Sequence, residues 1–169
     1  MTTAVFLRGI NIGSNKRISM PALREALEKA GHTGVKTLLQ SGNVVVDRIT
    51  AAAMEKLISD EFGLRVRAMT RTHDQLRKVI ESNPFPQHVG EPAKLAVGFL
   101  DKVVAKIDID PSRYVPDEFV LAGKEIYLWY PNGLGRSKLG DAVFAKALGE
   151  VALTVRNWNT VTKMAELTA

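Results

Sequence analysis

The chain has no cysteine among its 169 residues. This absence excludes disulfides, thiolate catalysis and zinc bound by thiolates, and it gives no support to a secreted, disulfide-stapled scaffold. No apolar run approaches the roughly 20 residues that span a bilayer. Met1-Thr2-Thr3 leads into an apolar stretch without the basic segment of a signal peptide. We therefore expect a cytoplasmic protein with no membrane segment.

Groups that carry catalysis or bind metals are also scarce. The histidines His32, His73 and His88 stand far apart, and none has a second ligand at helical metal-binding spacing. Asp108 and Asp110 stand just before a proline, which is more typical of a turn than of a cation site. Ser41 lacks both an identifiable histidine base and the nucleophile-elbow pattern. We expect no metal and no cofactor, and whether the protein is an enzyme, for example of phosphate-ester chemistry, stays open.

Charge gives a mild preference for anionic partners. The net charge is +5, and a positive balance of this kind favours association with anions. The cations are spread along the chain, whereas a dedicated nucleic-acid binder more often has a dense basic patch. A chain of this length can bury roughly 70 % of its unfolded surface, so it needs no disulfide or bound metal to fold.

The order of apolar patterns in the first 71 residues predicts an α+β fold. An apolar run over 3–8 is followed by helical spacing after Ser19, and two short strands flank Ser41-Gly42. Helical spacing returns after Thr50, and an alternating stretch over 64–71 indicates a half-buried strand. This order is β-α-β-β-α-β, the ferredoxin-like unit.

A connecting helix is predicted next, because Thr72 and Gln75 have the spacing of a capping box. The second half then repeats the order of the first as a pattern, without residue-level identity. It has strand patterns over 94–100, 118–122, 125–130 and 152–155, and helical patterns over 103–107, 139–148 and after Asn157.

We predict two tandem ferredoxin-like repeats packed in one compact unit, with a connecting helix and a C-terminal helix. The predicted division is 1–71 for the first half, 72–93 for the connecting helix and loop, and 94–169 for the second half.

The first candidate site follows the first strand. Gly9 and Gly13 permit a tight loop whose N–H groups point one way, beside the charges of Arg8, Lys16 and Arg17. The spacing matches neither a Walker A loop nor the three-glycine dinucleotide fingerprint. An ordinary strand-to-helix connection with a basic rim is therefore the alternative.

A second segment is expected to meet this loop. A helix returns the chain between the first two strands, so these strands run parallel and their carboxyl ends share one edge of the sheet. The loop over 9–17 and the turn over 40–43 should therefore converge on one small anionic or polar ligand. The candidate ligand-binding residues there are Arg8, Gly9, Asn11, Gly13, Asn15, Lys16, Gln40, Ser41, Gly42 and Asn43.

Another candidate surface is the run Arg156, Asn157, Trp158 and Asn159. These side chains can stack on and hydrogen-bond to a planar ligand, with an anion at the helix N-terminus. In the alternative, Trp158 packs on the body of the protein while Asn157 or Asn159 caps the helix. Base stacking of the RNA-recognition type is disfavoured, because the strand Val44-Val45-Val46 has no aromatic residue.

Four segments together resemble a known family. They are Leu7-Arg8-Gly9-Ile10-Asn11-Ile12-Gly13, Leu39-Gln40-Ser41-Gly42-Asn43-Val44, Asn83-Pro84-Phe85 and Thr154-Val155-Arg156-Asn157-Trp158-Asn159-Thr160. Scattered over essentially the whole chain, they resemble the bacterial domain of unknown function family 1697. The resemblance implies two ferredoxin-like repeats in one compact protein and carries over no activity or catalytic residue.

The sequence thus favours a small phosphate-bearing or nucleotide-like ligand at the first loop and the first hairpin turn. The alternative is a nucleic-acid or protein interaction module without a small ligand. Neither the oligomeric state nor the grouping of Arg156–Thr160 with the first site is predicted.

Overall fold

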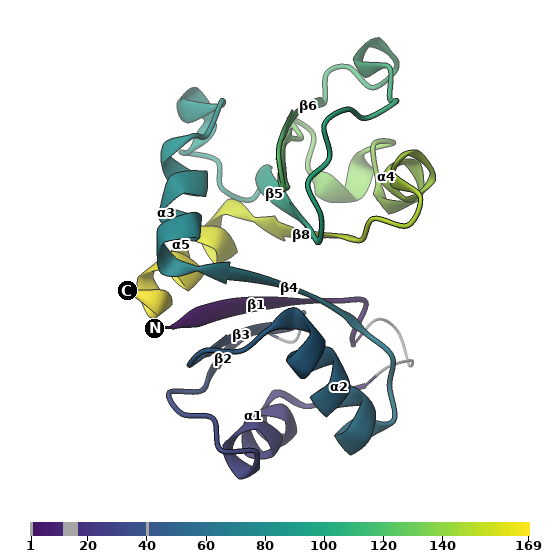
Figure 1. Cartoon of the computed structure of the whole chain (residues 1–169). Coiled ribbons are helices and arrows are strands. Elements are labelled where there is room, and N and C mark those ends of the chain that lie inside the picture. Colours follow the sequence, from purple (N-terminus) through teal and green to yellow (C-terminus); the bar gives the residue numbers. More distant parts are fainter. Residues whose placement is uncertain (1, 12–16, 40) are drawn as a thin grey trace. The chain divides into compact units, whose positions relative to one another are not determined.

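The computed structural model describes residues 2–11, 17–39 and 41–169 (Figure 1). It confirms the α+β class, with two four-stranded antiparallel sheets and five α-helices among the described residues. The first elements along the chain are β1 (Thr3–Arg8), α1 (Met20–Lys29), β2 (Lys36–Leu38), β3 (Asn43–Val46), α2 (Ala51–Phe62), β4 (Arg67–Thr72) and α3 (His73–Glu81). The remaining elements are β5 (Leu95–Leu100), β6 (Glu118–Ala122), β7 (Glu125–Trp129), α4 (Asp141–Leu148), β8 (Leu153–Asn157) and α5 (Trp158–Thr168), with single 3-10 turns at Pro86–His88, Pro111–Arg113 and Leu134–Arg136.

The chain divides into two compact units. Unit 1 comprises Met1–Arg77 together with Met164–Ala169, and unit 2 comprises Lys78–Lys163. The end of the chain therefore belongs to the unit that contains its beginning. Within unit 1, His73 Nδ1 lies 3.0 Å from the Ala165 carbonyl oxygen and 3.2 Å from Thr168 Oγ1.

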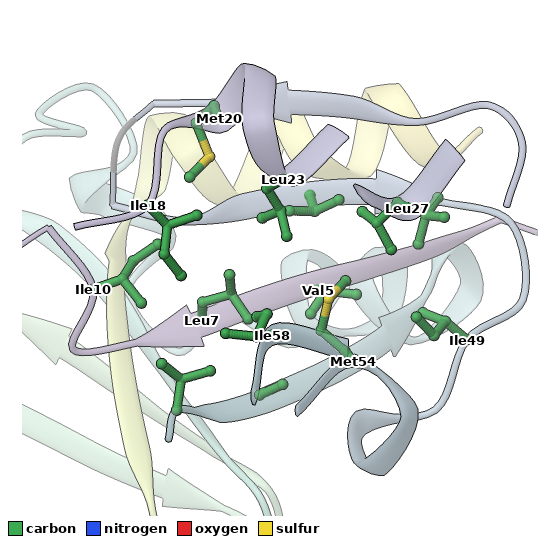
Figure 2. Close-up of a cluster of buried hydrophobic side chains, with 14 of the residues drawn as sticks. Val5, Leu7, Ile10, Ile18, Met20, Leu23, Leu27, Ile49, Met54 and Ile58 are labelled. Atoms are coloured by element: carbon green, nitrogen blue, oxygen red, sulfur yellow. The ribbon is translucent and has the colours of Figure 1, made fainter. Parts of the chain in front are cut away.

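The sheet of unit 1 has the strand order β2-β3-β1-β4. All of β1 except Arg8 is buried, as the continuous apolar run predicts. The helix-facing residues of the sheet, among them Val5 and Leu7, pack with the apolar stripes of α1 and α2 (Figure 2). Leu23 and Leu27 of α1 are fully buried in this cluster, and each such side chain stabilises the fold by about 1.5–3 kcal/mol.

Local signals set the helix ends where the sequence predicts them. Ser19 Oγ accepts from Ala22 N at 3.1 Å, and Thr50 Oγ1 accepts from Ala53 N at 3.0 Å. The predicted capping box of α3 is present, because Thr72 N donates to Gln75 Oε1 at 2.9 Å and Gln75 N donates to Thr72 Oγ1 at 3.2 Å. These bonds satisfy amide groups that would otherwise have no partner in the helix.

The sheet of unit 2 has the order β6-β7-β5-β8. The core on one face of this sheet includes Leu128, Phe144 and Leu148, and Phe119 meets Phe144 edge-on with ring centroids 6.1 Å apart. The two-residue connection at Gly123-Lys124 joins β6 and β7 as predicted.

The short helix predicted over 103–107 is wrong. This stretch has no helix, and the amide of Val104 donates to the Gly123 carbonyl at 2.9 Å instead of to a preceding turn. Val103, one of the apolar residues of this predicted helix, is 69 % exposed. The β-branched residues make a helix unfavourable here, and the hairpin turn offers a competing acceptor.

In the described part of the chain, no helix has both the length and the apolar character that crossing a membrane requires.

Candidate functional site

The described parts of the first loop and the first hairpin turn lie at one edge of the sheet of unit 1. The register pairs Phe6 of β1 with Asn43 of β3, and the next residue, Leu7, donates its amide to the Gly42 carbonyl at 2.8 Å. A Cβ on Gly42 would stand 2.7 Å from Ile10 Cδ1. The chain directly after β1 and the turn after β2 are therefore in van der Waals contact.

Two predicted ligand groups at this edge hold the loops themselves. The Asn11 carboxamide bonds both backbone groups of Ile18: its Nδ2 donates to the carbonyl at 2.9 Å, and its Oδ1 accepts from the amide at 2.8 Å. Asn43 is fully buried, and its Nδ2 donates to the Leu38 carbonyl at 2.7 Å and to Ser41 Oγ at 3.1 Å. These amide groups brace the two connections.

Positive charge gathers at the same edge. Arg8 ends β1 directly opposite Arg67 of β4, so the Cβ atoms of these two residues start about 5 Å apart. Arg67 Nε lies 3.5 Å from Glu55 Oε2, whereas Arg8 has no ion pair with any described residue. Arg17 is also exposed. Like charges directly opposite each other repel unless something negative lies between them.

The backbone of both connections is unusual at this edge. Among the described residues other than glycine, only Asn11 and Leu39 have positive φ, at 55° and 63°. Asparagine tolerates this region, but a leucine there is strained by about 1–2 kcal/mol. Leu39 is also 59 % exposed, so burial of its side chain does not compensate for the strain.

Four predicted ligand residues, Gly13, Asn15, Lys16 and Gln40, lie outside the described residues. Gly9 has a φ of 71°, as its predicted role in a tight loop requires. Ser41 is exposed in the turn.

Arg156 is buried in the sheet of unit 2. Its Nη1 donates to Thr154 Oγ1 at 2.6 Å and to the Val155 carbonyl at 3.0 Å. Burial lowers the pKa of Arg156 to about 10, because the low-polarity surroundings disfavour its charged form. Arg71 in unit 1 is its counterpart: it is also buried on the last strand of its sheet, and its Nη1 donates to the preceding carbonyl, that of Thr70, at 2.9 Å.

The three residues after Arg156 start α5. Asn157 Oδ1 accepts from Thr160 N at 3.0 Å and so caps the helix, while Trp158 is 6 % exposed. The sequence alternative, with a packed tryptophan and a capping asparagine, is therefore the arrangement present. Asn159 is exposed. This group belongs to unit 2, whereas the first loop and the first turn belong to unit 1.

Two features of unit 2 were not predicted. The His88 ring stacks on Trp129, with centroids 3.6 Å apart and an interplanar angle of 4°. Asn83 Nδ2 is buried and has no hydrogen-bond partner among the described residues, although Asn83 Oδ1 accepts from Phe85 N at 2.9 Å. The Asn-Pro-Phe pattern signals the turn around Phe85, but no local pattern pairs a loop histidine with a strand 41 positions later.

Within the described ranges, no group of three or more His, Asp or Glu side chains is arranged to hold a metal ion. The arrangement at the edge of unit 1 offers arginine side chains and loop amides, which bind anions.

The strand orders and helices define an α+β protein with two four-stranded antiparallel sheets. The chain belongs to the family described as "Protein of unknown function (DUF1697)", whose model matches residues 1–127. This confirms the family resemblance predicted from the sequence.

One solved structure, that of the conserved bacterial protein SP0830 from Streptococcus pneumoniae, is similar over 99 % of this chain and 98 % of its own. The TM-score is 0.62 and the sequence identity is 18 %, so the similarity concerns the fold alone. No curated protein shows a significant match to the chain.

Proposed function

We propose that this protein binds a small phosphate-bearing or nucleotide-like ligand at the edge of the sheet of unit 1. The observation that carries the proposal is the cross-strand pair of Arg8 and Arg67 beside the positive-φ residue Gly9. Arg67 already lies beside the Glu55 carboxylate, so a phosphate group at this edge would chiefly meet the Arg8 guanidinium and accept charge-assisted hydrogen bonds from it.

Backbone strain supports the same place. Strained residues persist where the surrounding structure enforces them, and they concentrate at binding sites. Leu39 is exposed and strained in the turn that meets the first loop. Asn11 and Asn43 hydrogen-bond to the protein's own loops. We therefore propose that Arg8 and the loop backbone bind the ligand, and we add Arg67, which the sequence did not suggest.

We also infer that the two sheets are tandem ferredoxin-like repeats. In each sheet, the strand that comes first in the chain lies between the third and the fourth, and the second lies at the edge beside the third. In both units a helix directly follows the fourth strand. Arg71 and Arg156 hold equivalent positions on those fourth strands. The second repeat lacks its first helix, since residues 101–110 pass between β5 and β6 without one.

The test is a thermal unfolding series of the full chain with inorganic phosphate, a nucleoside, and the corresponding mono- and diphosphates. A ligand at one hundred times its Kd stabilises by about 2.7 kcal/mol, which corresponds to a rise in Tm of roughly 5–10 °C. We expect phosphate-bearing compounds to raise Tm and the bare nucleoside to have little effect. Arg8→Gln should abolish the rise.

Arg24→Gln is the matched control, because Arg24 is an exposed arginine of the same unit and is held by Glu28 on its own helix at 3.1 Å. This variant should keep the full rise in Tm. No rise in the wild type, or an equal rise in the Arg8→Gln variant, would refute the proposal. Binding to RNA or DNA that weakens steeply with salt, without any effect of mononucleotides, would support the interaction module instead.

A further inference from the structure

The connection between β7 and α4 contains the only Asn-Gly pair of the chain, Asn132-Gly133. An asparagine followed by glycine is the pair that loses its side-chain amide most readily in water, because glycine has no side chain to hinder attack by its own nitrogen. In a folded protein, this reaction depends on the exposure of the asparagine, on the partners of its carboxamide and on the freedom of the next backbone amide.

The first two of these conditions are met at Asn132. The residue is exposed, and no described residue forms a hydrogen bond with its carboxamide. Nothing lies within 4 Å of the Cβ that Gly133 would carry, so the space beside the attacking nitrogen is open. A carboxamide that nothing holds can turn toward the next residue of its own chain.

One hydrogen bond restrains the third condition. Gly133 N donates to the Tyr130 carbonyl at 2.9 Å and closes a β-turn that has Pro131 and Asn132 at its centre. The bond must open before the nitrogen can attack. A hydrogen bond of this kind contributes only modestly to stability, so the turn is expected to slow the reaction by about two- to tenfold and not to prevent it. Exposed turns open without unfolding of the rest of the protein.

Three other asparagines lack at least one of these conditions. Asn11 and Asn43 are held by hydrogen bonds to their own loops, and Asn43 is also fully buried. Asn83 precedes Pro84, and proline has no N–H from which a nucleophile could form.

The two asparagines at the start of α5 are protected by the helix. Asn157 Oδ1 accepts from Thr160 N at 3.0 Å, which fixes the Asn157 side chain. Thr160 N is also the nitrogen that would have to attack Asn159, so the same bond protects both residues. Asn15 lies outside the described residues and is followed by lysine, whose side chain hinders the attack more than glycine does.

We propose that Asn132 is a site of spontaneous deamidation in the folded protein. The Gly133 nitrogen gives its proton to a base in solution and attacks Asn132 Cγ. The new C–N bond closes a five-membered succinimide ring, and the Cγ–Nδ2 bond breaks to release ammonia. Water then opens one of the two carbonyl–nitrogen bonds of the ring, which gives aspartate or isoaspartate. Water is the only co-reactant, and nothing is oxidised or reduced.

The product changes the charge and the backbone of this connection. Arg136 and Lys138 are its charged residues, and neither has an ion pair with a described residue. A carboxylate at position 132 adds a negative charge to this basic stretch and lowers the net charge of +5 by one. The isoaspartate form also lengthens the backbone by one methylene, and an isoaspartate carboxyl methyltransferase can methylate its carboxylate with S-adenosylmethionine.

The test is to age the full chain at mildly alkaline pH, with a parallel sample unfolded in guanidinium chloride. Peptide mapping by mass spectrometry then follows each asparagine. In the folded protein, Asn132 should convert before any other asparagine, about two- to tenfold more slowly than in the unfolded chain. Conversion as fast as in the unfolded chain would also support the site.

A variant and a control add a second measurement. An isoaspartate methyltransferase with labelled S-adenosylmethionine should label the aged wild type but not aged Asn132→Gln, because glutamine would have to close a six-membered ring and reacts far more slowly. Asn159→Gln, at an exposed position of α5, is the matched control and should be labelled like the wild type. Circular dichroism establishes that each variant is folded, and if Asn132→Gln does not fold, the peptide map of the wild type decides alone.

An Asn132 that keeps its amide in the folded protein while the unfolded chain converts would overturn the proposal. So would earlier conversion of another asparagine in the folded protein, or equal labelling of the aged wild type and a folded Asn132→Gln protein.

Discussion

An asparagine in a loop can bind a ligand or brace its own loop, and the sequence does not distinguish these two roles at the candidate site. Asn11 bonds the amide and the carbonyl of Ile18, as a neighbouring strand would. Whether such a carboxamide binds a ligand or its own loop depends on where the loop returns, seven residues later. The sequence therefore places the asparagine correctly at the edge but leaves its partner open.

We expect the carboxylate of Asp47 to make the stability of unit 1 depend on acidic pH. Asp47 follows β3, and its carboxylate oxygens lie 2.6 Å from His32 Nδ1, 3.2 Å from Thr33 N and 3.3 Å from Thr33 Oγ1. The hydrogen bond with His32 is the main reason why the pKa of Asp47 lies below its usual value of 3.8, and Thr33 adds to the effect.

Because the pKa of Asp47 is lower in the folded state, its carboxylate contributes stability that is present above the usual pKa and lost as the pH falls through the lowered one. We expect the free energy of unfolding of the wild type to fall below about pH 4. Asp47→Asn should remove this part of the decline, as measured by urea unfolding at several acidic pH values. Asp60→Asn, an exposed site on α2, is the control. Parallel pH profiles for the wild type and Asp47→Asn would contradict the expectation.

At the scale of elements, the connection between β2 and β3 depends on one glycine. Gly42 has a φ of 92°, and a Cβ there would lie 2.7 Å from Ile10 Cδ1 and 2.9 Å from Leu7 Cβ. The Leu7 contact is severe, because that Cβ is fixed to the central strand. Gly42→Ala should therefore lower the free energy of unfolding by about 2–4 kcal/mol, combining backbone strain with overpacking.

Gly34→Ala separates these two causes. Gly34 also has positive φ, at 65°, but nothing lies within 4 Å of the Cβ it would gain. This control should cost about 1 kcal/mol from backbone strain alone. Urea unfolding of both variants measures the difference, and equal losses would mean that the turn and the first loop are not in contact.

Elements with a local chemical signal were predictable from the sequence. The capping box of α3, the cap at Thr50 and the turn at Gly123-Lys124 each depend on residues within a few positions of one another. The helix predicted over 103–107 failed because its amide at Val104 found an acceptor in a distant turn. Periodicity alone carries no information about such competition.

Some features of the candidate site could likewise be predicted from the sequence, and others could not. The meeting of the first loop and the first turn follows from strand direction, which the chain order supplies. The opposition of Arg8 and Arg67 depends on register across β1 and β4, 59 positions apart, and the alternating pattern predicts only that Arg67 faces outward. The buried role of Arg156 was hidden because its acceptors are the Thr154 hydroxyl and a backbone carbonyl, groups too common in sequences to signal a pairing.

At the scale of the whole molecule, the chain closes unit 1 with its last residues. Met164 is fully buried and Thr168 is 4 % exposed, and both belong with Met1–Arg77. Residues 1–77 therefore complete their unit only after the rest of the chain has been made. This order predicts that a single substitution near the C-terminus weakens the strands near the N-terminus.

Met164→Ala tests this prediction. Removing a fully buried methionine side chain costs about 2–5 kcal/mol, and 2 kcal/mol corresponds to roughly thirtyfold faster exchange through global opening. We expect this acceleration at the amides of β1, measured by hydrogen exchange. Tryptophan fluorescence does not serve for unit 1, because Trp129 and Trp158 both lie in unit 2. Asn159→Ala, at an exposed position of the same helix α5, should leave the exchange of β1 unchanged. Equal exchange of β1 in the wild type and Met164→Ala would show that the end of the chain contributes nothing to the stability of unit 1.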